Sequence, residues 1–351
     1  MGTKQDTGAP VKAGDLATPS LLADAGVLER NVATMAKVRP GLTLRPHVKA
    51  FKCTSLAAVL KEAGHTAFCC ATTREVSGMV SAGLGNDLLL ANEVIDITRL
   101  AVLSAHVTAG EARITVAVDS HEGIVAASAA GITEVLIDVD VGMPRCGCQP
   151  DEAGAVADAA RAAGLHVRGV MGYEGHMMHE VNRTVREAGV VSSMSMLESA
   201  HDQVGGDVVS GGGTGTFDCN DTVNELQAGS YVLMDGDYAR LGLPFEEGLT
   251  VTTTVISVGG GGHAVLDGGL KALAMDSGPP EVQGNGKVLF CADEHTTVVG
   301  SSWKVGDRVG LRPAHIDPTI SKHEHIYLVD DIMSGGDAEL VETWPVDLRG
   351  W

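Results

Sequence analysis

The feature that most constrains this chain is a repeated alternation of apolar, strand-like runs with alanine-rich segments that close near a glycine. Several runs are apolar throughout, as expected of strands buried on both faces, and the segments between them carry helical periodicity. The runs cover residues 44–50, 67–72, 87–92, 113–119, 134–141, 166–173, 207–211 and 225–234. Eight such units in about 200 residues predict an α/β fold with a (β/α)8 barrel, the TIM-barrel architecture.

An open, doubly wound sheet is the alternative arrangement of the same elements. In dinucleotide-binding sheets of that kind, the glycine-rich loop follows the first strand. Here the glycine-rich segment 210–216 follows the seventh run. The order of the elements therefore favours the barrel.

The pattern changes near residue 245, where Thr and Val begin to alternate over residues 249–258. Shorter strand-like runs follow at close spacing, as in small β domains. They cover residues 263–266, 287–291, 308–312, 325–329 and 339–344. We predict a barrel domain over residues 24–243 and a mostly-β domain over residues 244–351, which the N-terminal strand 16–23 joins.

Charge and composition exclude several classes of partner. The formal net charge of −20 argues against binding to nucleic acid or to an anionic membrane. No apolar run is long enough to span a bilayer, and no secretory signal is evident. The seven cysteines form no disulfide framework, and we expect reduced thiols in a soluble, cytoplasmic protein.

Polar residues follow nearly every predicted strand, at the end of a barrel where active sites gather. The glycines of segment 210–216 allow backbone N–H groups to converge on an anion, and barrels commonly hold phosphate after the seventh strand. A lysine amine and a phosphate cradle at one face predict pyridoxal 5′-phosphate with Lys49 as its covalent anchor. The other strand-end residues of interest are Arg145, Tyr173 and Tyr231.

Two histidine motifs also suggest chemistry. His315 and Asp317 are two residues apart, so on a strand they would share one face and could chelate a divalent cation: Mn²⁺ or Mg²⁺, with Zn²⁺ possible. A surface His beside a turn-forming Asp-Pro is the alternative. His176 and His179 follow the sixth run, where a loop context favours acid–base work over metal ligation. For His176, a solvated loop histidine is the alternative.

Six segments, taken together and in order, resemble the D-threonine aldolase family of fold-type III pyridoxal-phosphate enzymes, whose relatives include D-serine dehydratase and alanine racemase. The resemblance spans roughly residues 18–350. Its segments are Arg-Pro-His-Val-Lys at 45–49, Gly-Gly-Thr-Gly-Thr-Phe at 212–217, Glu-Leu-Gln-Ala-Gly-Ser-Tyr-Val-Leu-Met-Asp at 225–235, Gly-Leu-Lys-Ala-Leu-Ala-Met-Asp-Ser-Gly at 269–278, Asp-Glu-His at 293–295 and His-Ile-Asp-Pro at 315–318.

The resemblance implies a homodimer with a barrel of alanine-racemase type and a C-terminal β domain. It implies that Lys49 bonds the cofactor, that Arg145 and Tyr173 flank it, and that His179 stands at the position of the catalytic base. The loop of Gly213, Thr214 and Gly215 would hold the phosphate, and His315 and Asp317 the metal. The chain departs from the family after Lys49, where Ala50 and Phe51 replace Thr and His. We expect that change to reshape the pocket beside the cofactor.

The activity implied is reversible cleavage of a β-hydroxy-D-amino acid to glycine and an aldehyde. A dehydratase acting on D-serine or 3-hydroxy-D-aspartate is the alternative, although the dehydratase relatives tend to carry Cys where this chain has Asp317. A racemase would leave the metal pair unexplained. A non-catalytic pyridoxal-phosphate-binding protein of the superfamily would consist of a single barrel, without the second domain.

Overall fold

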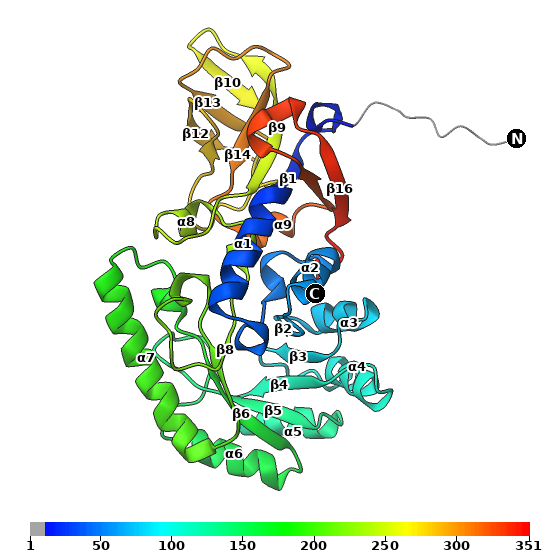
Figure 1. Cartoon of the computed structure of the whole chain (residues 1–351), viewed down its shortest axis with the longest axis vertical. Coiled ribbons are helices and arrows are strands. Elements are labelled where there is room, and N and C mark those ends of the chain that lie inside the picture. The colour runs from blue at the N-terminus through cyan, green and yellow to red at the C-terminus, as the bar shows by residue number, and fades with distance from the viewer. Residues whose placement is uncertain (1–10) are drawn as a thin grey trace, which may run out of the picture. The chain divides into compact units, whose positions relative to one another are not determined.

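The computed structural model describes residues 11–351, whose contacts form two compact units, shown in Figure 1. The larger unit contains residues 31–232, 237–245 and 346–351. The smaller unit contains the described residues up to Arg30, together with residues 233–236 and 246–345. The predicted domain limits, 24–243 and 244–351, stay a prediction.

Seven parallel strands form the sheet of the larger unit, and each pairs with the next in chain order. They are β2 (Ala67–Cys70), β3 (Asp87–Leu90), β4 (Ile114–Val118), β5 (Glu134–Asp138), β6 (His166–Gly172), β7 (Val208–Gly211) and β8 (Glu225–Leu226). The helices that alternate with them are α2 (Thr54–Glu62), α3 (Thr73–Ser81), α4 (Ile97–Thr108), α5 (His121–Ala129), α6 (Ala153–Ala162) and α7 (Arg183–Val204).

The predicted helices end where the glycines indicated. Gly131 follows α5 with φ +79°, and Gly164 follows α6 with φ +84°. This left-handed conformation ends a helix at little energetic cost only when the residue lacks a Cβ. The chain then enters the next strand, whose buried side chains fill the barrel core.

The segment 44–47 closes the ring between the last strand and the first. Leu44 forms a parallel bridge with Leu226 of β8, and His47 forms one with Cys69 of β2. The predicted first strand 44–50 is therefore wrong in extent, because the chain curls into the 3-10 turn Val48–Ala50 directly after His47. Pro46 has no N–H group to extend a ladder, and only its carbonyl bonds to β2.

The predicted eighth strand, 225–234, is also shorter than expected. Beyond β8 the backbone at Gly229 passes so close to the closing segment that a Cβ there would lie 2.4 Å from the carbonyl oxygen of His47. The chain then turns through the 3-10 segment Ser230–Val232. The barrel of alanine-racemase type thus has seven regular strands and one irregular position.

The smaller unit is a nine-stranded sheet. Strand β1 (Ser20–Asp24) pairs antiparallel with β9 (Leu249–Val258) and parallel with β15 (His325–Val329), so this strand belongs to the sheet of the smaller unit. The other strands are β10 (His263–Leu266), β11 (Glu281–Val282), β12 (Lys287–Cys291), β13 (Thr296–Val299), β14 (Arg308–Arg312) and β16 (Leu340–Pro345). The remaining α-helices are α1 (Ala25–Val38), α8 (Gly236–Ala239) and α9 (Ile316–Ile320). Among residues 11–351, no helix is both long and apolar enough to cross a membrane.

A buried charge network lies at the amino-terminal ends of the barrel strands. The guanidinium of Arg45, 1% exposed, forms two hydrogen bonds with Glu225 at 2.6 and 2.8 Å and one with Asp87 at 2.9 Å. Arg168 bonds the other oxygen of Asp87 at 3.1 Å. Burial alone would raise the pKa of Asp87, but these two cations outweigh it and lower that pKa.

Replacing Arg45 with Ala should lower the free energy of unfolding by about 3–5 kcal/mol, because two carboxylates would lose their shared cation inside the protein. Arg99→Ala is the control, since the ion pair of Arg99 with Asp96 is about half exposed on both sides and should contribute at most about 1 kcal/mol. Urea unfolding of the two variants measures the difference. Equal, small losses would show that the network contributes little.

Candidate active site

Three of the predicted site residues meet at the carboxyl ends of the barrel strands. Lys49 lies in the 3-10 turn that follows the closing segment, and Tyr173 directly follows β6. The Lys49 ammonium nitrogen is 5.5 Å from the centroid of the Tyr173 ring, and the Arg145 guanidinium carbon is 5.4 Å from the same centroid. One aromatic ring therefore carries two cations, in the range of cation–π contact.

His47 lies beside this group. Its Nδ1 accepts a hydrogen bond from the Lys49 backbone N–H at 3.4 Å. Burial, and then the charges of Lys49, Lys52 and Arg145, lower the pKa of His47 well below its ordinary value. The imidazole is neutral at physiological pH, so the positive charge of the mouth comes from the lysines and the arginine. This local field suits an anionic ligand despite the acidic net charge of the whole chain.

The residues at which the chain departs from the family motif face the protein interior. Phe51 has no exposed surface, and Ala50 is 1% exposed. A Cβ on Gly229 would lie 2.8 Å from the Cβ of Ala50. Neither side chain is solvent-accessible, and the expectation that this change reshapes the pocket beside the cofactor stays a prediction.

Lys52 ends the turn in a left-handed conformation, with φ +51°. Its ammonium group pairs with the fully buried carboxylate of Glu75. Glu75 also accepts hydrogen bonds from the N–H groups of Ala71 and Thr72 at the start of α3. The ion pair thereby anchors the Lys49 turn to the neighbouring β2–α3 connection.

The glycine-rich segment follows β7 as the short turn Thr214–Thr216. A Cβ on Gly213 would lie 2.6 Å from the sulfur of Met178, and one on Gly215 would lie 2.0 Å from the Met178 carbonyl oxygen. A larger residue would not fit at either position, because the loop after β6 packs directly behind the turn. The Gly213 N–H donates to the Thr216 hydroxyl at 3.3 Å, whereas the first two N–H groups of the turn itself, those of Thr214 and Gly215, are of the kind that has no partner within a turn and can bind an anion.

A buried carboxylate that sequence reasoning missed lies behind the same segment. Glu174 has no exposed surface and accepts hydrogen bonds from Gly212 N–H at 3.1 Å, the Thr216 hydroxyl at 2.8 Å and the Asn220 amide at 2.8 Å. Only its place beside Tyr173 could have drawn attention to it. Glu174 shapes the loop and does not face its open side.

Tyr231 is joined to the glycine-rich segment through its backbone, whose N–H donates to the Thr214 hydroxyl at 3.1 Å. Its ring packs on Phe245, with centroids 5.5 Å apart. Its own hydroxyl is buried and has no hydrogen-bond partner in the described part of the chain, and burial raises its pKa well above the ordinary value. A buried donor without a partner, in a residue whose backbone bonds the glycine-rich segment, fits an anionic ligand group such as a phosphate.

His179 pairs with a residue that the sequence motifs did not indicate. Its Nδ1 lies 3.1 Å from the carboxylate of Asp237, and its ring packs on Tyr238 with centroids 4.6 Å apart. Arg240 pairs with the same carboxylate. Asp237 lies two residues beyond the end of the motif at 225–235, which is why motif matching missed it. His176 is an exposed residue of the 3-10 turn Gly175–Met177.

Carboxyl groups gather near Arg145. Asp138 ends β5 and is 5% exposed. Burial, and then the charge and hydrogen bond of Glu93, raise the pKa of Asp138 well above its ordinary value. Asp119, after β4, adds to that effect. The nearby Arg145 guanidinium opposes this effect and lowers the pKa of Asp138.

The predicted metal pair belongs to the smaller unit and does not lie on a strand. His315 is the residue before α9, and Asp317 lies in the first turn of that helix. The strand prediction is wrong because Asp-Pro begins a helix here, where proline is tolerated. His315 Nδ1 lies 2.5 Å from Asp276, so its Nε2 faces away from that carboxylate. No group of three or more potential ligands among residues 11–351 could hold a metal, so any site here rests on two side chains.

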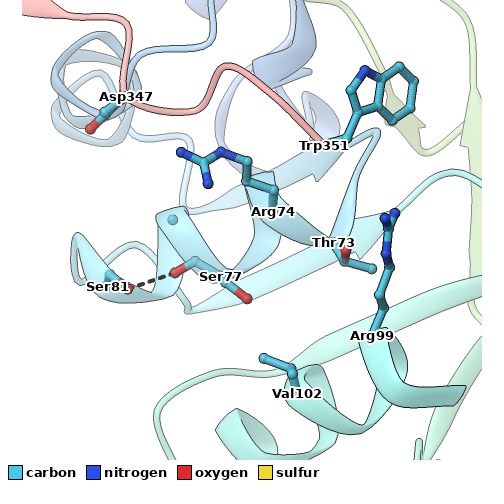
Figure 2. A pocket seen from close by; sticks show the side chains of 9 residues that line it. Thr73, Arg74, Ser77, Ser81, Arg99, Val102, Asp347 and Trp351 are labelled. Atoms are coloured by element: carbon cyan, nitrogen blue, oxygen red, sulfur yellow. Dashed lines mark hydrogen bonds between the residues drawn. The ribbon is translucent and has the colours of Figure 1, made fainter. Parts of the chain in front are cut away.

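A hollow of about 390 Å³ lies between α3 and α4 of the larger unit (Figure 2). Arg74 and Arg99 line it with Ser77 and Val102. The Arg74 Nε already donates to the carbonyl oxygen of Arg349 at 2.6 Å, and Arg99 pairs with Asp96. The hollow contains none of the predicted site residues.

Known protein families match both parts of the chain. Residues 23–237 match the alanine racemase N-terminal domain, and residues 248–329 match the putative serine dehydratase domain. The chain is 33% identical to D-threonine aldolase from Arthrobacter sp., over 97% of this chain and 96% of that protein. It is 34% identical to 3-hydroxy-D-aspartate aldolase from Paracoccus denitrificans (strain Pd 1222), over 96% of this chain and 93% of that protein.

The crystal structure of D-threonine aldolase from Filomicrobium marinum superposes with a TM-score of 0.90 and 33% identity, over 97% of both chains. The chain belongs to the D-threonine aldolase family. It is a lyase, and the fold-type III resemblance seen in the sequence is confirmed. Pyridoxal phosphate is the cofactor of this family, and the glycine cradle, the unpartnered Tyr231 hydroxyl and the cations on the Tyr173 ring fit it.

Tyr231→Phe should have different effects on the cofactor-free and the cofactor-bound protein. Without cofactor, removing a buried hydroxyl that has no partner should leave the free energy of unfolding unchanged or raise it by up to about 1 kcal/mol. Pyridoxal phosphate should bind roughly five- to tenfold more weakly, because the phosphate would lose a donor. Denaturant unfolding and cofactor titration measure both, with Tyr327→Phe as the control. A clearly destabilised cofactor-free variant would show that the hydroxyl already has a partner.

Proposed function

We propose that this protein catalyses the reversible cleavage of β-hydroxy-D-amino acids to glycine and an aldehyde. The observation that carries the proposal is the convergence of Lys49 and Arg145 on the Tyr173 ring. The loop that supplies this ring also packs behind the glycine-rich segment. Both curated relatives described above are aldolases for β-hydroxy-D-amino acids.

The residues that would hold pyridoxal phosphate occupy the mouth of the barrel. Lys49 would bond the aldehyde carbon, Arg145 and Tyr173 would flank the ring, and Gly213, Thr214, Gly215 and Tyr231 would hold the phosphate. When bound, this cofactor supplies an electron sink that accepts the electron pair of the broken bond.

His179 would remove the proton of the substrate β-hydroxyl. Its Nδ1 lies 3.1 Å from the carboxylate of Asp237, so we assign the proton transfer to Nε2. Asp237 is itself paired with Arg240, and its carboxylate stabilises the imidazolium that forms when the proton is taken. This is the role of the carboxylate in a His-Asp pair, and the packing of Tyr238 on the imidazole limits its rotation.

His315 and Asp317 would hold a divalent metal in the smaller unit, with Asp276 orienting the imidazole from behind. When bound, the metal would supply a Lewis acid for the β-hydroxyl. Two side chains fill only part of the coordination shell of Mn²⁺ or Mg²⁺, so water and substrate would complete it. We therefore infer a weakly held metal that chelators remove readily.

Incubation with D-threonine and with 3-hydroxy-D-aspartate, in the presence of Mn²⁺, should yield glycine and an aldehyde. EDTA and His315→Ala should each lower kcat/KM by 100-fold or more, because the β-hydroxyl would lose its Lewis acid. His325→Ala, a change at an exposed histidine of the same unit, is the control and should retain activity.

Release of ammonia and a 2-oxo acid, without glycine, would show a dehydratase and overturn the proposal. Conversion of one enantiomer into the other without cleavage would show a racemase. Full activity after metal removal would exclude the metal from the mechanism and leave the cleavage reaction itself intact.

A further inference from the structure

The carboxylate of Glu174 is fully buried behind the barrel mouth. Its oxygens accept three hydrogen bonds, from a backbone N–H, a hydroxyl and a side-chain amide of the segment 212–220. All three donors are neutral. A buried charge held only by such donors is stable only while each of them keeps its position.

The positions of the three donors require a carboxylate, and not an amide, at residue 174. One oxygen of Glu174 accepts from Gly212 N–H, and the other accepts from both Thr216 and Asn220. A glutamine in the same place has one carbonyl oxygen and one NH₂ group. Its NH₂ group would face a donor whichever way the amide is turned. Glu174→Gln therefore disturbs the loop while leaving the size of the side chain unchanged.

The residues on either side of Glu174 contact the same loop. A Cβ on Gly213 would lie 3.7 Å from the Tyr173 ring and 2.6 Å from the sulfur of Met178. The Met178 carbonyl lies against Gly215, and the next residue is His179. The β6 loop thus supplies the ring beside Lys49, the support of the glycine-rich turn and the candidate base within seven residues.

We propose that Glu174 is a positioning residue that holds the glycine-rich turn in its phosphate-binding conformation. By drawing Gly212 N–H and the Thr216 hydroxyl inward, the carboxylate directs the turn so that the N–H groups of Thr214 and Gly215 face outward. The inference rests on the proposed function only in assigning the cofactor phosphate to this turn. Glu174 touches neither substrate nor cofactor.

The test compares two ligands that differ only in the phosphate. Pyridoxal phosphate and pyridoxal are titrated into cofactor-stripped wild-type enzyme, Glu174→Gln and the control Glu198→Gln. Glu198 is an exposed residue of α7 whose nearest hydrogen-bond partner, Thr222, is 3.5 Å away. The ratio of the two dissociation constants measures the contribution of the phosphate alone.

Wild type and Glu198→Gln should prefer pyridoxal phosphate by the same ratio. Glu174→Gln should reduce that ratio at least tenfold, with pyridoxal binding changed by less than about threefold. Equal weakening of both ligands would mean that Glu174 only stabilises the fold, and an unchanged ratio would mean that it has no positioning role. Either result overturns the inference.

Thr216→Val removes one donor and keeps the shape of the side chain, so it provides the same test if Glu174→Gln does not fold. Its ratio should fall about threefold, and an unchanged ratio would again overturn the inference. Neither measurement depends on catalysis. An enzyme with the expected ratios that releases no aldehyde would contradict the proposed function and leave the role of Glu174 standing.

Discussion

The pairing of residues 44–47 with the first and last strands is the constraint on which the site depends. The bridges Leu44–Leu226 and His47–Cys69 close the parallel ring, so the carboxyl ends of all its strands meet at one mouth. Lys49 follows this segment by two residues and therefore reaches the same mouth as Tyr173 and Arg145. Without that closure, Lys49 would lie at the open edge of a sheet.

The two ends of the barrel differ in how their charged residues are paired. At the amino-terminal end, Arg45 and Arg168 are matched by Asp87 and Glu225, so that charge is compensated inside the protein. At the mouth, Lys49 and Arg145 lie over the Tyr173 ring beside a neutral His47, and Lys52 is paired with the buried Glu75. The net charge of −20 describes the chain as a whole and not the local field at the mouth.

Most of the fold was predictable because it follows from local periodicity. Apolar runs and closing glycines indicated the β/α units, and the alternating segment 249–258 indicated β9 (Leu249–Val258). The missed residues Glu174, Asp237 and Asp276 act through partners distant in sequence, which no local pattern shows. The predicted strand at His315 and Asp317 was wrong for a local reason. A two-residue spacing fits a strand, but these residues lie at the start of a helix.

The most direct test of the central claim is to locate the cofactor on the chain. Enzyme loaded with pyridoxal phosphate is reduced with borohydride, digested and examined by mass spectrometry. The structure predicts one modified lysine, Lys49, because its amine lies beside Tyr173 whereas Lys52 is paired with the buried Glu75. An adduct on Lys52 or another lysine, or no adduct at all, would contradict the account.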